Sequence, residues 1–173
     1  MQCKNILITG PPSCGKTTLI EKLIKIVPRP VSGFITREVR VTGKRVGFSI
    51  EAIDGARAIL AHLDVSSPWR VGKYGVCIEA VDQIAVPSIL NKDTEVVLVV
   101  DEIGKMECFS ALFRRTIIEI LDSRHIVLGS IARKGGPFIQ QIRTRKDILL
   151  VEVNSGNRNE LVDSLLGIIS LAS

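Results

Sequence analysis

The chain has 173 residues, of which 46% are hydrophobic, 24% are charged and 4% are aromatic, and its formal net charge is +5. This length and composition predict a single folded domain over residues 1–173 and exclude an intrinsically disordered chain. The excess of positive charge suits an anionic ligand, whereas the scarcity of aromatic rings argues against a module that stacks the bases of single-stranded nucleic acid.

The first predicted elements are a buried strand and an amphipathic helix. A short apolar run over residues 6–9 ends at a Gly-Pro-Pro turn, as a buried strand does before a loop. Apolar residues then recur at helical spacing over residues 19–27, and Pro28 ends the pattern. The predicted order is therefore strand, loop, helix.

After this helix the apolar pattern changes to alternation. Residues 39–41 and 46–50 alternate on either side of Thr42-Gly43-Lys44, which is typical of two antiparallel strands joined by a tight turn. We therefore expect an antiparallel β-hairpin inserted after the first helix. Residues 74–78 predict a short strand, and residues 79–90 predict a short helix.

The second half of the chain alternates strands with helices. Residues 95–100 form an apolar, β-branched run that ends at Asp101-Glu102, as a strand covered on both faces does. Further helices are predicted over residues 109–121, 138–142 and 159–169, and further strands over residues 126–131 and 148–153. This order predicts an α/β fold with a mostly parallel sheet covered by helices on both faces.

A phosphate-binding loop is the clearest motif. It reads Gly10-Pro11-Pro12-Ser13-Cys14-Gly15-Lys16-Thr17 and fits G-x-x-x-x-G-K-[ST] between a predicted strand and a predicted helix. Backbone N–H groups of such a loop and the positive end of the following helix bind phosphate. In such loops the lysine bridges the β- and γ-phosphates and the final hydroxyl is a ligand of Mg²⁺, so we assign these roles to Lys16 and Thr17.

Charged residues follow two of the predicted core strands. Asp101 lies at the edge where open α/β sheets bind their ligands, and its carboxylate suits Mg²⁺. Glu102 is placed to orient and deprotonate a water molecule that faces the γ-phosphate. Arg133 follows the strand over residues 126–131, and an arginine there would neutralise charge in the transition state.

Cysteines and long apolar runs indicate the cellular setting. Four cysteines and two histidines lack the paired spacing of a zinc site, so we expect free thiols, as in a reducing compartment. No run approaches the 18 consecutive apolar residues of a membrane span, and no signal-peptide core develops before Gly10. These features predict a cytoplasmic protein with no membrane partner.

Longer motifs resemble a small nucleoside-triphosphatase family of thermophilic prokaryotes that also has a human member. They are G-F-I-T-R-E-V-R over residues 33–40, the segments 71–74 and 142–147, D-E-I-G-K-M-E over residues 101–107, and Asn157-Arg158. The resemblance implies a RecA-like P-loop domain that hydrolyses nucleoside triphosphates (ATP, GTP, CTP and UTP) to diphosphates and phosphate. It further implies slow turnover, use of Mg²⁺ and little preference for the base.

The resemblance also assigns roles to the site. It gives Walker A roles to Lys16 and Thr17 and Walker B roles to Asp101 and Glu102, and it places Gly104 and Lys105 beside the phosphates. The nucleotide-binding set that we expect is Gly10, Pro11, Pro12, Ser13, Cys14, Gly15, Lys16, Thr17, Leu98, Val99, Val100, Asp101, Glu102, Ile103, Gly104 and Lys105. Ser13 stands where the family commonly has a third glycine, so the loop lacks glycine's free choice of a positive φ there.

Two alternatives stay open. A nucleotide or small-molecule kinase would use the same loop, with Arg143 and Arg145 in its lid. A nucleotide-gated binding module would contact RNA or DNA through the basic segment 133–146, although nothing else in the chain supports nucleic acid as a partner. We expect a monomer whose ligands are nucleoside triphosphates, with Asn157 and Arg158 as the first candidates to contact the base.

Overall fold

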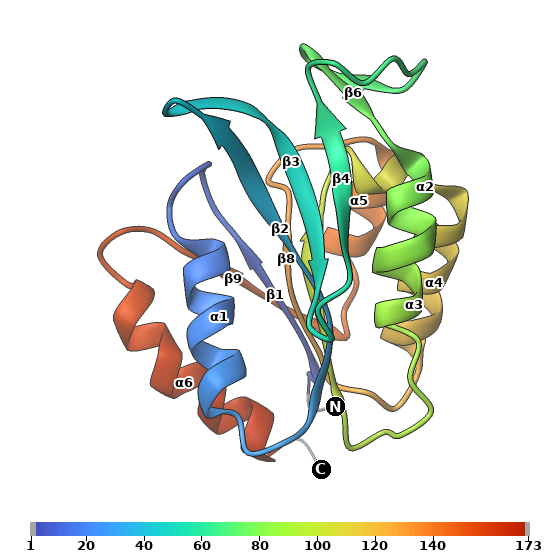
Figure 1. Cartoon of the computed structure of the whole chain (residues 1–173). Helices are drawn as coiled ribbons and strands as arrows, with labels where there is room; N and C mark the ends of the chain where they lie inside the picture. Colours follow the sequence, from blue (N-terminus) through green and yellow to red (C-terminus); the bar gives the residue numbers. More distant parts are fainter. Residues whose placement is uncertain (1–2, 172–173) are drawn as a thin grey trace.

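A nine-stranded sheet organises the fold in the computed structural model, which describes residues 3–171 (Figure 1). Its strand order is β5-β6-β4-β3-β2-β7-β8-β1-β9. The strands are β1 (Asn5–Thr9), β2 (Val31–Val41), β3 (Lys44–Ala52), β4 (Arg57–His62), β5 (Arg70–Val71), β6 (Tyr74–Val76), β7 (Val97–Ile103), β8 (Val127–Ile131) and β9 (Ile148–Glu152).

The sheet has a parallel half and an antiparallel half that share β2. In the parallel half, β2, β7, β8, β1 and β9 pair in parallel. In the antiparallel half, β2, β3, β4, β6 and β5 pair in antiparallel fashion. The prediction of a mostly parallel sheet was therefore wrong. The predicted hairpin is present, but its strands continue the sheet because β2 pairs with β7 on one side and with β3 on the other.

Three differences from the predicted strands bear on the site. β7 runs to Ile103, so Asp101 and Glu102 lie inside the strand and not after it. The short strands β4 and β5 were not predicted. In β4 the neighbouring residues Leu60 and Ala61 are both buried, which breaks the alternation that would have marked a strand.

Helices cover both faces of the sheet, which confirms that prediction (Figure 1). One face carries α1 (Lys16–Ile26) and α6 (Arg158–Leu171). The other face carries α2 (Ile78–Ala80), the π-helical η1 (Val81–Ala85), α3 (Val86–Ser88), the 3₁₀ turn η2 (Glu107–Phe109), α4 (Ala111–Asp122) and α5 (Pro137–Arg143). No helix within residues 3–171 combines the length and apolar character needed to cross a bilayer.

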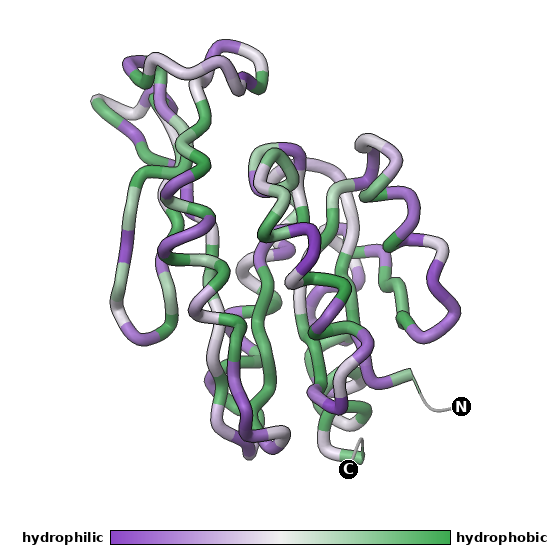
Figure 2. Tube along the Cα trace, turned by 90° about the vertical axis from the view of Figure 1, so that its right-hand side faces the viewer, coloured by the Kyte–Doolittle hydropathy of each residue, from purple (hydrophilic) through white to green (hydrophobic). Residues whose placement is uncertain are grey.

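Two apolar layers fix the parallel strands from both sides. Leu19 and Leu23 of α1 pack with Ile6 and Ile8 on one face, and Phe113 of α4 belongs to the layer on the other face. In Figure 2 the trace through the middle of the molecule is mostly green, whereas purple is frequent at turns. Because full burial of one such side chain contributes about 1.5–3 kcal/mol, the carboxyl ends of these strands are firmly positioned.

Candidate active site

The phosphate-binding loop joins β1 to α1 at the carboxyl edge of the parallel half. Gly15 is the N-cap of α1 and has a φ of 98°, which favours glycine. A Cβ at Gly15 would lie 2.5 Å from Nη1 of Arg158, so a larger residue would collide with that side chain. In the described part of the chain no side chain caps the first turn of α1, which leaves its N–H groups to bind an anion.

Ser13 adopts a positive φ although it is not glycine. Its φ is 60°, so the loop has the left-handed conformation that a third glycine would have favoured. The serine at this position therefore adopts the left-handed conformation at a conformational cost that glycine would avoid.

The ammonium group of Lys16 lies over the loop. Nζ donates to the carbonyl oxygens of Gly10 and Pro11, at 3.3 and 3.4 Å. It also lies 4.0 Å from Oε2 of Glu102. One cation is thus positioned between the phosphate-binding loop and the acidic end of β7.

Thr17 of α1 and Asp101 of β7 lie in direct contact. The Thr17 hydroxyl donates to Oδ2 of Asp101 at 2.7 Å, and the Ser130 hydroxyl donates to Oδ1. The Asp101 side chain is buried, and this burial raises the pKa of its carboxyl, while the hydrogen bonds from Ser130 and Thr17 and the charge of Lys16 oppose the rise. Ser130 was not predicted, although a hydroxyl inside an apolar strand is a usable signal.

Oxygen atoms of Thr17 and Asp101 suit Mg²⁺ chemically. Mg²⁺ takes one or two carboxylates and completes its shell with phosphate oxygens and water. Within residues 3–171, no cluster of three or more His, Cys, Asp or Glu side chains could hold a metal ion by itself. The Thr17 hydroxyl and the Asp101 carboxylate are therefore the groups here that suit an Mg²⁺ ion whose other ligands are phosphate oxygens and water.

Glu102 follows Asp101 and is less buried. Its side chain is 34% exposed and lines the same cavity as Lys16. Burial raises the pKa of the Glu102 carboxyl, the charge of Lys16 lowers it, and Asp101 raises it. A carboxylate with a raised pKa that still reaches solvent is suited to accept a proton from water.

A cavity of about 570 Å³ unites these groups. The parallel half contributes Lys16, Thr17, Asp101, Glu102 and Lys134 to its lining, together with Pro12, Ser13 and Gly15 of the loop. The facing side of the lining comes from β2, β3 and β4, which contribute Thr36, Glu38, Arg45, Phe48 and Leu60. The phosphate-binding groups therefore lie on one wall, and the hairpin forms the facing wall.

Glu107 is a buried acid in this cavity that sequence reasoning missed. Only 3% of it is exposed, and burial together with the neighbouring charges of Glu102 and Asp101 raises its pKa to about 8. Oγ1 of Thr36 donates to the main-chain oxygen of Asp101 at 2.6 Å and lies 3.5 Å from Oε1 of Glu107. Glu107 is thus protonated near neutral pH and lies directly behind the acidic pair.

Several residues of the predicted nucleotide-binding set lie in the core. Leu98, Val99, Val100 and Ile103 are fully buried in β7 among the two apolar layers and do not line the cavity, so their contact with a nucleotide stays a prediction. Gly104 is also buried, and a Cβ there would lie 2.7 Å from Oε2 of Glu107 and 2.9 Å from Oε1 of Glu102.

The other predicted positions lie in or beside the loop and cavity. Lys105 is exposed and lines the cavity. The main-chain N–H of Cys14 donates to the oxygen of Pro11 at 3.4 Å, within the loop itself. Gly10 and Pro11 contribute the carbonyl oxygens that hold Lys16, although they do not line the cavity.

The three candidate arginines lie in different surroundings. Arg133 follows β8 at the expected edge, but Nη2 lies 3.3 Å from Oε1 of Glu152, and its half-exposed side chain is outside the cavity lining. Arg143 donates to Oγ1 of Thr9 at 3.0 Å and to the oxygen of Ala132 at 3.2 Å, which ties β1 to the end of β8. Neither side chain contacts Lys16 or Asp101 in this arrangement.

Arg145 lies at the opposite end of the strands. It pairs with Asp122 at 2.6 Å and with Asp147 at 2.7 Å, beside the start of β9. Two carboxylates thus hold Arg145 at the amino edge of the sheet, away from the phosphate-binding loop over which the kinase alternative would place it in a lid.

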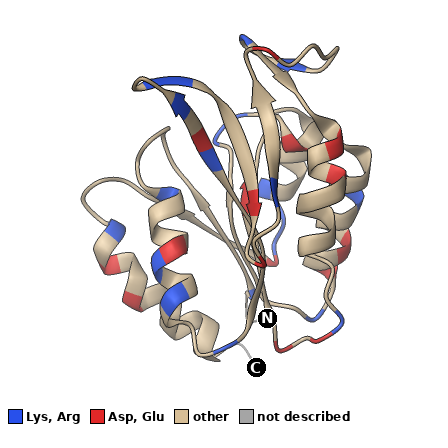
Figure 3. Cartoon of the chain, in the orientation of Figure 1, with Lys and Arg blue, Asp and Glu red and all other residues tan. Residues whose placement is uncertain are grey.

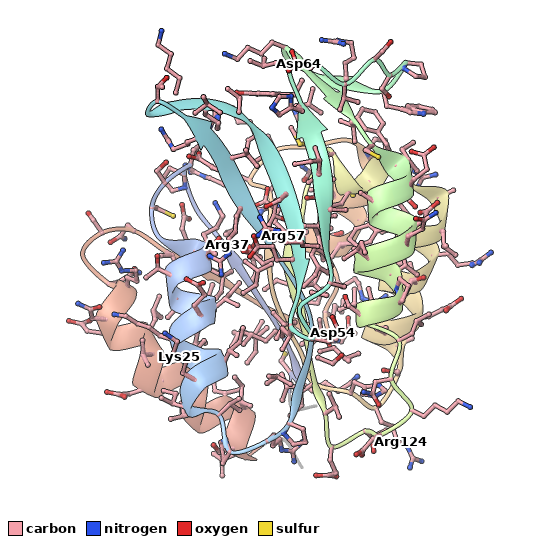
Figure 4. The ribbon with its side chains drawn as sticks, in the orientation of Figure 1. Lys25, Arg37, Asp54, Arg57, Asp64 and Arg124 are labelled. Carbon is pink, nitrogen blue, oxygen red and sulfur yellow. The ribbon has the colours of Figure 1, made fainter. Side chains whose placement is uncertain are left out.

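The three arginines of the hairpin formed by β2 and β3, Arg37, Arg40 and Arg45, all pair with carboxylates. Arg37 pairs with Glu21 of α1 at 2.6 Å and with Glu51 of β3 at 2.8 Å, and Arg57 also pairs with Glu51. Arg37 lies on β2 and Arg57 on β4, and Figure 4 labels both in the same region of the sheet. Figure 3 shows blue and red segments interspersed there. This face is therefore a mixed surface and not an open basic patch.

Asn157 lies in the segment that joins β9 to α6, and Arg158, the first residue of α6, lies beside the phosphate-binding loop. Asn157 donates from Nδ2 to the oxygen of Glu152 at 3.0 Å and accepts from the N–H of Asn154. Arg158 packs against Gly15, and its Nε is buried without a partner in the described part of the chain. This segment therefore borders the loop on the side away from β7.

Known proteins are similar to this chain in both sequence and fold. A family model described as NTPase matches residues 5–166. The nucleoside-triphosphatase THEP1 of Thermotoga sp. (strain RQ2) is 42% identical over 165 residues, which cover 95% of this chain and 94% of that protein. The human cancer-related nucleoside-triphosphatase is 38% identical over 180 residues, which cover 94% of this chain and 95% of that protein.

Two solved structures have the same architecture. The crystal structure of THEP1 from Aquifex aeolicus superposes with a TM-score of 0.87 at 32% identity and covers 95% of this chain and 98% of that one. The solution structure of the human cancer-related nucleoside triphosphatase gives a TM-score of 0.81 at 38% identity, covering 95% of this chain and 96% of that one. With its α/β P-loop fold and these relatives, the chain belongs to the NTPase family.

Proposed function

We propose that this chain hydrolyses nucleoside triphosphates to nucleoside diphosphates and phosphate. The observation that carries the proposal is the juxtaposition at the loop: Thr17 lies 2.7 Å from Asp101, and Lys16 lies 4.0 Å from Glu102. The family membership and the nucleoside-triphosphatase names of the relatives point to the same reaction.

The reaction follows from the position of each side chain. The loop N–H groups and Lys16 bind the β- and γ-phosphates at the start of α1. Glu102 accepts a proton from a water molecule as its oxygen bonds to the γ-phosphorus and the bond from that phosphorus to the bridging oxygen breaks. Most of the rate enhancement comes from positioning and from stabilising the charge on the transferring group.

Thr17 and Asp101 are the residues that would hold Mg²⁺. When bound, the ion neutralises charge on the β- and γ-phosphates. Ser130 keeps the Asp101 carboxylate oriented by donating to its second oxygen, and Thr36 holds the main chain at the same residue.

Arg133 is our candidate for stabilising the transition state. Its ion pair with Glu152 is on the surface, and such pairs contribute only about 0–1 kcal/mol. Breaking this ion pair therefore costs little free energy when the Arg133 guanidinium moves toward the γ-phosphate of a bound triphosphate.

Broad base specificity and slow turnover are also part of the proposal. Affinity would reside in the loop, Lys16 and the metal, all of which contact phosphate and none of which reads a base. The base would lie toward Asn157 and Arg158, beyond the loop. We further propose a RecA-like grouping of the fold and a cytoplasmic, monomeric protein that acts as one domain.

A phosphate-release assay tests this function. ATP, GTP, CTP and UTP are each supplied with and without Mg²⁺ and without any acceptor molecule. We expect Mg²⁺-dependent release from all four, with kcat/KM values that agree within about tenfold. Release that requires an added acceptor would favour the kinase alternative, and a hundredfold preference for one base would contradict broad specificity.

A further inference from the structure

A second cavity, of about 530 Å³, adjoins the nucleotide site. It lies between the turn that joins β5 to β6, the start of α4 and the start of α5, and these elements lie together on the right-hand side of Figure 1. Val71 and Lys105 line both cavities, so the two spaces meet on the side of the site that carries Glu102. This volume is in the range of small-molecule sites.

The charged groups of the second cavity are all cations. Arg70, Lys105 and Arg114 line it, and none of its lining residues in the described chain is Asp or Glu. Within residues 3–171 these three side chains form no ion pair with a carboxylate, whereas Arg37 and Arg145 each pair with two.

Their contacts leave hydrogen-bond donors unused. Nη2 of Arg70 donates to the oxygen of Lys73 at 2.8 Å, and Nη1 of Arg114 donates to the oxygen of Cys108 at 2.5 Å. Each guanidinium has five N–H donors, so others remain to bind an anion.

Aromatic and aliphatic side chains form the remaining walls. Phe109, Phe138 and Ile139 line the cavity. The ring of Trp69 lies 5.3 Å from that of Phe109, centroid to centroid. Such walls favour a flat ring, because an aromatic side chain stacks on a base with little dependence on its identity.

We propose that this cavity binds a monophosphorylated ligand with a flat ring, of the nucleoside monophosphate class, while a triphosphate fills the phosphate-binding loop. The phosphate contacts Arg70 and Arg114, and the ring lies against Phe109 and Phe138. The proposal requires that the loop bind a triphosphate but not that it hydrolyse one, so it can fail or succeed independently of the proposed hydrolysis.

Equilibrium dialysis with radiolabelled AMP tests the site. The loop is first saturated with Mg²⁺ and the non-hydrolysable triphosphate AMPPNP, so that AMP cannot occupy it. We expect one AMP per chain, and at least about tenfold weaker binding by adenosine, which lacks the phosphate, and by ribose 5-phosphate, which lacks the base. No AMP binding, or equal binding of ribose 5-phosphate, would overturn the proposal.

Variants locate the binding within the molecule. Arg70→Ala and Phe138→Ala should each weaken AMP binding by about tenfold. Arg115→Ala is the matched control, because Arg115 follows Arg114 on α4, is exposed, and pairs with Glu119 outside the cavity. If AMP binds equally to folded Arg70→Ala, Phe138→Ala and Arg115→Ala chains, the binding site is elsewhere and the assignment is wrong.

Discussion

The two halves of the sheet are built for different purposes. In the parallel half, Val97 to Val100 of β7 are completely buried, and the strands end at the groups that contact each other around Asp101. In the antiparallel half, β3 mixes exposed and buried positions, and its charges pair on the surface through Glu38 and Glu51. We therefore expect the phosphate chemistry in the firmly packed parallel half, whereas the more exposed antiparallel half forms the facing wall of the cavity.

β2 connects the two halves at the site. Ile35 pairs in register with Asp101, and the next residue, Thr36, bonds to the Asp101 oxygen and lies beside Glu107. The hairpin wall is therefore attached to the acidic end of β7 through a single strand. Four sets of variants test how far the division between the halves holds.

The largest effect is expected for Glu102→Gln in the parallel half. It removes the proton acceptor and should lower kcat by about 10²–10⁴-fold with little change in triphosphate binding. Lys16→Ala should instead weaken binding, because it removes a charged phosphate contact worth about 1.5–3 kcal/mol. Glu51→Gln in the antiparallel half is the matched control and should leave kcat within about twofold. Steady-state kinetics and calorimetric titration with AMPPNP measure both quantities, and equal turnover in Glu102→Gln and wild type would remove Glu102 from the mechanism.

The Arg133→Ala variant tests whether an arginine of the parallel half stabilises the transition state. We expect kcat to fall by about 10²-fold while triphosphate affinity changes little, and Arg133→Lys to restore only part, because an ammonium lacks the planar fork. Arg57→Ala, an exposed arginine paired with Glu51 on the antiparallel half, should leave kcat unchanged. If Arg133→Ala behaves like Arg57→Ala in steady-state assays, the pair with Glu152 is the whole role of Arg133.

Glu107→Gln probes the buried acid where the halves meet. In the folded chain the pKa of Glu107 is raised from 4.5 to about 8, so the folded state keeps a proton that the unfolded state loses. Its stabilising contribution is fully present below pH 4.5 and is lost as pH rises toward about 8, at about 1.4 kcal/mol per pH unit. The Gln variant lacks this loss, so its free energy of unfolding should rise relative to wild type across that window.

Urea unfolding at pH 5, 6, 7 and 8 measures this difference. Glu119→Gln is the control, because Glu119 is exposed on α4 and should change the free energy of unfolding by less than about 0.5 kcal/mol at every pH. Parallel pH profiles for wild type and Glu107→Gln would show that Glu107 is ionised in the folded chain.

The smallest effect compares two strained residues, one in each half. Ser13 in the phosphate-binding loop and Thr42 in the hairpin turn have φ values of 60° and 47°. Ser13→Gly and Thr42→Gly should each stabilise the chain by about 0.5–1 kcal/mol. Relief of the Cβ strain in the folded state should exceed the cost of ordering the more flexible glycine on folding. Thr42→Gly should leave kcat/KM unchanged. Destabilisation of both variants in urea would contradict the left-handed assignment.

The parts of the fold that follow local patterns could be predicted from the sequence. The loop, α1 and the core strands β1 and β8 follow from apolar periodicity and from the G-K-T motif, which act over a few neighbouring residues. The mixed sheet could not be predicted, because strand partners are set by long-range packing; β2 carries no local sign that it pairs with both β3 and β7.

The site was predictable only where its residues lie next to one another in sequence. Lys16, Thr17, Asp101 and Glu102 stand in recognisable motifs, and the fold brings them together. Ser130 and Thr36 join them through hydrogen bonds between strands, which no spacing reveals. Leu98 to Val100 show the opposite case, because they precede the motif in sequence but both apolar layers bury them.

Incorporation of oxygen from labelled water is the most direct test of water attack on the γ-phosphorus at this loop. ATP is hydrolysed by the wild-type chain in H₂¹⁸O with Mg²⁺ in a single turnover, and the products are separated and analysed by mass spectrometry. We predict one ¹⁸O atom in the released phosphate and none in the ADP, and loss of this product in Glu102→Gln. Label in the ADP, or labelled phosphate formed equally fast by Glu102→Gln, would contradict attack by a water molecule that Glu102 activates.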